Sequence, residues 1–168
     1  PKLSRPPPLL TRLSFLALEK SVNCEALLPA LWMNQLQSLS LQFSLQDSIP
    51  FRLRGLDEYC ALRELTIEMS HWSDFGLFDW SPCALPLVHT LNFVNMRVPD
   101  DEWLGKKFPS LASLSVCDPH YQHFVLDRAR PPRRMLSNLP HLTSLRMNID
   151  FGAETFQNLH PDTRLRSL

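Results

Sequence analysis

The chain has 168 residues, and its 17 basic and 17 acidic side chains give a formal net charge of zero. This balance argues against nucleic acid as the main partner, because binding to phosphates requires an excess of Lys and Arg on one face. No stretch reaches the roughly 18–20 apolar residues of a membrane span, and four widely spaced cysteines are too few for a disulfide scaffold, so we expect an intracellular protein, in cytoplasm or nucleus, with reduced thiols.

The chain opens with a polar, proline-rich segment at residues 1–8, which has none of the apolar core of a secretory signal. Fifteen Pro against four Gly disfavour phosphate-binding loops, long regular helices and hairpin-rich sheets. There is no initial Met, and the chain ends within a repeated leucine pattern. We therefore expect it to be a piece of a longer protein.

Leucine is the most frequent residue, with 32 copies in the whole chain, and six segments share the pattern Leu-x-x-Leu-x-apolar, one of them with Val first. These segments begin at Leu10, Leu36, Leu62, Val88, Leu111 and Leu142, and a seventh, cut off, begins at Leu165. The intervals are 26, 26, 26, 23, 31 and 23 residues. Apolar and polar residues alternate within each segment, as in Leu39-Ser40-Leu41, which predicts strands with one buried face.

The segments before the strands predict short helices of about 8–12 residues, because their apolar residues recur near helical spacing. We expect such helices around residues 24–32, 51–56, 103–108 and 135–139. Asp100 and Asp101 suit the first turn of the third helix. Pro86, Pro109 and Pro140 stand two residues before a strand's first apolar position, where we expect them to end the helix and force an extended approach to the strand.

Strands that are joined by crossover helices within one sheet make that sheet parallel, and repeats of this size bury a core only by stacking on one another. The sequence thus predicts an α/β solenoid over residues 9–168. It would be curved, with parallel strands on the concave side, short irregular helices on the convex side and about six to seven irregular repeats.

The pattern is similar to that of leucine-rich-repeat proteins, and in particular to the irregular intracellular repeats of fungal-type F-box/leucine-rich-repeat proteins. Phe108-Pro-Ser-Leu111-Ala-Ser-Leu114 and Leu139-Pro-His-Leu142-Thr-Ser-Leu145 resemble the recurrent F/L-P-x-L-x-x-L unit of that group. One feature departs from the usual repeat, which carries Asn or Cys five residues after its second Leu. The corresponding residues here are Leu18, Ser44, Ser70, Met96, Pro119 and Asp150, so we expect the turns to be held in another way.

The resemblance implies a protein-interaction module, namely the substrate-recognition repeats of an F-box-type ubiquitin-ligase receptor. In that family an F-box, which these residues do not include, docks on a cullin–RING ligase adaptor. A leucine-rich-repeat scaffold or adaptor with no ubiquitin-ligase link is the alternative. The sequence carries no phosphate loop, G-x-S-x-G elbow or H-E-x-x-H motif, so we expect neither an enzyme nor a cofactor.

Polar side chains at the outward strand positions form columns across the predicted sheet. The first column is Arg12, Ser38, Glu64, Thr90, Ser113 and Ser144. The second is Ser14, Ser40, Thr66, Asn92, Ser115 and Arg146, and the third is Leu16, Gln42, Glu68, Val94, Cys117 and Asn148. Because solenoids bind proteins on extended concave faces, we expect the first two columns to contact a partner. A merely solvated sheet face is the alternative.

An arginine-rich insertion at residues 127–134 lies within the longest repeat. Proline keeps this segment extended. We expect its side chains Arg130, Arg133 and Arg134 to bind an acidic partner segment or phosphate. A solvated loop insertion is the alternative.

Residues 70–80 hold four aromatic side chains. Two of them, Trp72 and Phe75, are candidate partner anchors, since Trp is common among binding hot spots, or else fill the convex side.

Cysteine and histidine give no metal signature. Cys117, His120 and His123 offer three ligands without a fourth nearby, so we expect a turn that carries two His rather than a zinc site. Cys60 and Cys83 precede strands and are expected to be small core residues.

Overall fold

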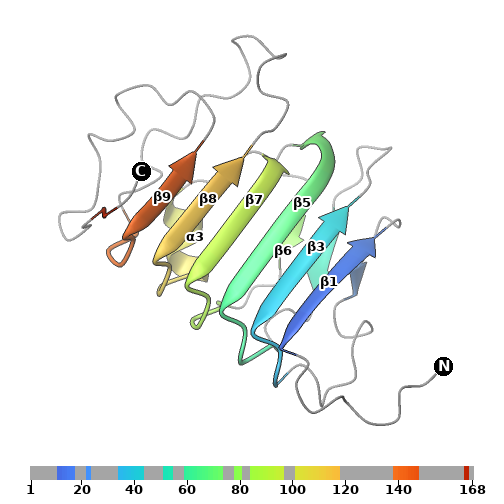
Figure 1. The fold of residues 1–168 in the computed structure, drawn as a ribbon, viewed down its shortest axis with the longest axis horizontal. Helices are drawn as coiled ribbons and strands as arrows, with labels where there is room; N and C mark the ends of the chain where they lie inside the picture. Colours follow the sequence, from blue (N-terminus) through green and yellow to red (C-terminus); the bar gives the residue numbers. More distant parts are fainter. Residues whose placement is uncertain are drawn as a thin grey trace.

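The computed structural model describes residues 11–17, 22–23, 34–43, 51–54, 59–73, 78–80, 84–96, 101–117, 138–147 and 165–166. Six strands form an open, all-parallel sheet in the order β1-β3-β5-β7-β8-β9 (Figure 1). They are β1 (Arg12–Ala17), β3 (Ser38–Phe43), β5 (Glu64–Ser73), β7 (Thr90–Met96), β8 (Ser113–Cys117) and β9 (Ser144–Met147). The protein is therefore α/β with a parallel sheet, and all six predicted strands are confirmed.

The first residues of the six strands pair in one register, which places equivalent apolar residues side by side. Leu39, Leu65, Leu91, Leu114 and Leu145 occupy the same position on successive strands, and all five are buried. Burial alternates with period two along β3, β7 and β8, as expected for strands that are covered on one face. A register slip of one residue would turn this apolar row to solvent, so the leucine pattern fixes the pairing.

Main-chain hydrogen bonds also join the residues just before successive strands and form a ladder across the sheet. The carbonyl of Thr11 accepts the N–H groups of Gln37 and Ser38, both at 2.9 Å, and the carbonyls of Gln37, Arg63, His89 and Ala112 each accept two N–H groups at the start of the next strand in the same way. The carbonyl of Thr143 accepts the N–H of Arg166 at 2.7 Å, which brings the predicted seventh segment onto the sheet. The unequal intervals in the sequence therefore leave this ladder unbroken.

A tight turn precedes each of four strands and is closed by an N–H···O=C bond across four residues. The turns are Tyr59–Leu62, Leu85–Val88, Phe108–Leu111 and Leu139–Leu142, with N···O distances of 3.0 to 3.2 Å. The first and last residues of each turn are buried. Pro86, Pro109 and Pro140 occupy the second position, which favours the fixed φ of proline. Their role is to set these turns, which differs from the predicted extended approach.

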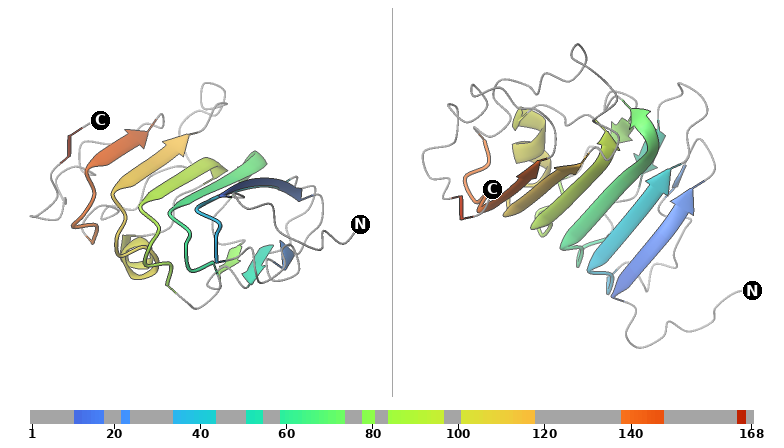
Figure 2. Two further views of the ribbon diagram at one scale, coloured as in Figure 1. Left: turned by 60° about the horizontal axis from the view of Figure 1, so that its bottom comes forward. Right: turned by 45° about the horizontal axis from the view of Figure 1, so that its top comes forward.

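The covered side of the sheet carries a second, three-stranded parallel sheet and a helix (Figures 1 and 2). The small sheet consists of β2 (Val22–Asn23), β4 (Phe51–Arg54) and β6 (Phe78–Trp80). The helix predicted over 51–56 is therefore wrong. Phe51 and Leu53 alternate with Arg52 and Arg54, and this period of two suits a strand.

The helix predicted around 103–108 is confirmed as α3 (Asp101–Lys107), with Asp101 as its first residue. Several predicted features lie outside the described residues. They are the helix over 24–32, most of the helix over 135–139, Asp100 and the lead-in at 1–8. Within the described part of the chain, no helix is long and apolar enough to cross a membrane.

The helix α3 is fastened to the sheet at its carboxyl end. Leu104 and Phe108 are buried, and the ring of Trp103 meets Phe108 edge to face with centroids 5.6 Å apart. The carbonyl of Lys107 accepts the N–H of Leu85 at 2.7 Å, which ties the helix to the turn before β7. Burial of Leu104 and Phe108 is the main contribution that stabilises the packing of α3 on the sheet.

The register shifts once, between β5 and β7, where a single asparagine bridges the strands. Glu68 pairs with Val94, but the next pair is Ser73 with Met96. Between these two pairs, β5 therefore contains more residues than β7. Asn95 lies in this gap with φ of 57° and is 5% exposed. Its Nδ2 donates to the Met69 carbonyl at 2.7 Å. Asn95 lies near the end of β7, one residue before the expected Asn/Cys position, and its hydrogen bond supports the chain there in another way.

Candidate functional site

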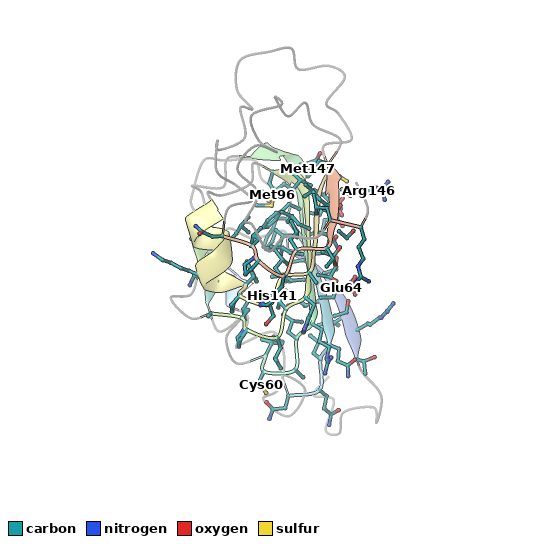
Figure 3. All side chains as sticks on the ribbon, turned by 90° about the vertical axis from the view of Figure 1, so that its left-hand side faces the viewer. Cys60, Glu64, Met96, His141, Arg146 and Met147 are labelled. Carbon is teal, nitrogen blue, oxygen red and sulfur yellow. The ribbon has the colours of Figure 1, made fainter. Side chains whose placement is uncertain are left out.

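The open face is the face of the six-stranded sheet that points away from α3 and the small sheet. Its described side chains are Arg12, Ser14, Ser38, Ser40, Gln42, Glu64, Thr66, Glu68, Thr90, Asn92, Val94, Ser113, Ser115, Cys117, Ser144 and Arg146. Figure 3 shows the sheet edge-on, with Glu64 and Arg146 on the side opposite α3. These residues alternate along the strands with the buried leucines, which is why the chain presents them together.

The strand register confirms the predicted columns as neighbours in space. Each residue of the first two columns pairs with the next residue of its column, from β1 through to β9. In the third column Leu16, Gln42, Glu68, Val94 and Cys117 are aligned in the same way, whereas Asn148 lies outside the described residues. The structure thus gathers the twelve predicted strand residues on one face.

Hydrogen bonds fix several of these side chains. Asn92 Nδ2 donates to Thr66 Oγ1 at 3.0 Å, which joins β7 to β5. Gln42 Nε2 donates to Glu68 Oε1 at 3.3 Å, which joins β3 to β5. Side chains that are already held in place lose less conformational entropy when a ligand binds, so this part of the face is preorganised.

The charges on the open face are segregated by strand. Glu64 and Glu68 stand on β5, Arg12 on β1 and Arg146 on β9. The face residues of β7 and β8 between the acidic strand and Arg146 are uncharged. The face is therefore polar but divided into an acidic centre and two basic flanks.

The structure describes no side chain of the other candidate partner residues. Arg130, Arg133 and Arg134, as well as Phe75, lie outside the described residues, and Trp72 lies in β5 with its side chain not described.

Cys117 ends β8, whereas His120 and His123 lie outside the described residues. No group of three or more metal-ligating side chains gathers among the residues that the structure describes.

Cys60 is exposed, so the prediction that it is a small core residue is wrong. It occupies the second position of the Tyr59–Leu62 turn, where the chain points away from the core and the other turns carry proline. Its Sγ lies 3.1 Å from Asn34 Oδ1 as a hydrogen-bond donor. Cys83 is outside the described residues.

Exposed side chains of the residues in the main-chain ladder also precede the first column and were not predicted from the sequence. Gln37, Arg63 and His89 are exposed, and each stands one residue before a member of the first column; Arg166, which donates to the Thr143 carbonyl, is exposed as well. The ring Nδ1 of His89 is hydrogen-bonded to the carbonyl of Leu87. A polar residue at this place in successive copies was a visible signal, but the prediction considered only the strand positions.

The chain matches none of the family models, curated proteins or solved structures to which it was compared. The functional conclusion therefore rests on the residues of the chain and their arrangement.

Proposed function

We propose that this chain is a leucine-rich-repeat interaction module whose open face, as the concave side of a solenoid, binds a protein partner. The observation that carries this proposal is the strand pairing from β1 to β9, which keeps two polar columns aligned on the open face. Seven similar segments at intervals of 23 to 31 residues support the repeat assignment. Extended faces of this kind suit protein ligands.

The parent protein in this proposal is an F-box-type substrate receptor of a ubiquitin ligase. The F/L-P-x-L-x-x-L units at Phe108 and Leu139 support the proposal, and both units form the same proline turn. The repeats hold the substrate, and other subunits carry out the transfer of ubiquitin. The chain itself acts by binding, without cofactor, in the cytoplasm or nucleus. The exposed thiol of Cys60 fits a reducing compartment, where such a group stays free.

The test uses the tagged parent protein, purified from cells and examined by quantitative mass spectrometry. Ser115 lies at the centre of β8 on the open face, and Ser115→Arg places a long cation there. His141→Arg is the matched control, because His141 is exposed in the turn before β9 and not on the open face (Figure 3). We expect specific partners to be lost from Ser115→Arg and retained by His141→Arg, with both variants folded by circular dichroism.

Three outcomes distinguish the parts of the proposal. Retention of every specific partner by folded Ser115→Arg would overturn binding on the open face. Recovery of the cullin adaptor with both variants supports the receptor, because the F-box of such a receptor lies outside this chain. If partners depend on Ser115 but neither adaptor nor cullin is recovered, a repeat scaffold without a ligase link is the better account.

A further inference from the structure

The acidic pair and one arginine of the open face are aligned across the strands. Glu64 and Glu68 stand two residues before and two residues after Thr66 on β5. Thr66 pairs with Asn92, Asn92 with Ser115, and Ser115 with Arg146. A line drawn across the sheet from Arg146 therefore passes between the two carboxylates.

The side chains along this line are short and uncharged between its two ends. Asn92 and Ser115 are the residues of β7 and β8 on it, and the amide of Asn92 is already bonded to Thr66 Oγ1. The main chain of a ligand that lies along this line therefore contacts short polar side chains, and it meets no charged side chain between β5 and Arg146. Glu68 receives one bond from Gln42 Nε2, and a carboxylate has acceptor capacity for further donors.

The length of the line sets the spacing of a complementary ligand. Thr66 and Arg146 are separated by three strand spacings, which amount to about 14 Å at about 4.8 Å each. An extended chain advances about 3.3–3.6 Å per residue, so about four residues cover this distance. A cation over Thr66 has a carboxylate on either side, and a carboxylate over β9 meets a guanidinium, which can bind it through two parallel hydrogen bonds.

We propose that the open face binds an extended peptide segment that crosses from β5 to β9. The segment carries a Lys or Arg between Glu64 and Glu68 and an Asp or Glu on Arg146, about four residues away. This inference rests on the proposed function and adds the chemistry of the partner. Complementary charge selects among partners, because a wrong segment places like charges together.

The experiment selects ligands from a displayed library of random 12-residue peptides on the full chain. Binding of the selected peptides is then measured by fluorescence anisotropy. The reversal variant combines Glu64→Lys, Glu68→Lys and Arg146→Glu, which raises the net charge by two. The control combines Gln35→Lys and Ala84→Lys, which makes the same change in net charge at exposed positions of the connections before β3 and β7, outside the open face. Ser115→Arg reports whether a peptide occupies the open face at all.

We expect the selected peptides to share a basic and an acidic residue about four positions apart. Their affinity should fall at least about tenfold on the reversal variant and less than about twofold on the control. Peptides in which the two charges are exchanged should recover binding to the reversal variant. This rescue is the decisive result, since a variant that is merely damaged cannot produce it.

The negative outcomes differ for the two proposals. Peptides that are blocked by Ser115→Arg but unaffected by charge reversal would overturn this inference and leave binding on the open face in place. Peptides that bind Ser115→Arg as well as the wild type would count against both. A library that yields no peptide for the wild-type chain would also overturn the inference.

Discussion

Gly105 of α3 lies against the main-chain carbonyl of Asn138, the residue just before the Leu139–Leu142 turn: a Cβ at position 105 would be 2.6 Å from that oxygen. The same Cβ would be 3.0 Å from the Cβ of Asn138. The helix thus reaches the turn of the last described strand only because residue 105 has no side chain. This contact and the Lys107–Leu85 bond hold α3 between two turns of the sheet.

Replacement of Gly105 by Ala should destabilise the protein. Helix propensity alone favours Ala by about 1 kcal/mol, but displacement of a packed backbone costs about 1–3 kcal/mol. We therefore expect a net loss of up to about 2 kcal/mol in the free energy of unfolding, measured by urea denaturation. A clear gain in stability for Gly105→Ala would show that α3 does not pack on the turn in solution.

Replacement of Leu114 by Ala should destabilise the protein much more than the same change at its neighbour. Leu114 is fully buried in the middle of the apolar row, and truncation of such a residue costs about 2–5 kcal/mol through the cavity that it leaves. Ser113→Ala is the control, because Ser113 is half-buried on the open face, and its loss should stay within about 0.5 kcal/mol. Equal thermal stability of the two variants would mean that the assigned strand register is wrong.

The sequence predicted the six-stranded sheet and the columns on its open face because leucine spacing determines which strand positions are buried. The same reasoning failed at Phe51–Arg54, a segment of four residues that is too short for periodicity to separate helix from strand. It failed at Cys60 because a turn determines the exposure of this residue. The other three turns can be recognised in the sequence by proline at this position, whereas this turn carries cysteine. Asn95 was missed because the register shift between β5 and β7 depends on pairing across 26 residues.

Asn95 should tolerate Gly better than Ala. Both substitutions remove the hydrogen bond to the Met69 carbonyl, and a buried acceptor that loses its partner costs about 1–3 kcal/mol. Ala at a φ of 57° adds backbone strain of about 1 kcal/mol, which Gly avoids. We expect Asn95→Ala to be less stable than Asn95→Gly, and both to be less stable than the wild type, in chemical denaturation. If Ala equals Gly, the residue does not hold a left-handed conformation in solution.

Replacement of Cys60 by Pro should stabilise the protein, because the other three turns already carry Pro at this position. The Tyr59–Leu62 turn is closed by the same 3.0 Å bond from Leu62 N to Tyr59 O that closes the Phe108–Leu111 turn. Proline at a compatible position lowers the entropy of the unfolded chain and adds about 0.4–1 kcal/mol. The change also removes the thiol donor to Asn34, a weak bond at the surface. Cys60→Ala measures that loss separately, so the comparison that matters is Pro against Ala in the free energy of unfolding. A Pro variant less stable than the Ala variant would mean that the Tyr59–Leu62 turn differs in backbone conformation from the three proline turns, and that the four turns are not equivalent.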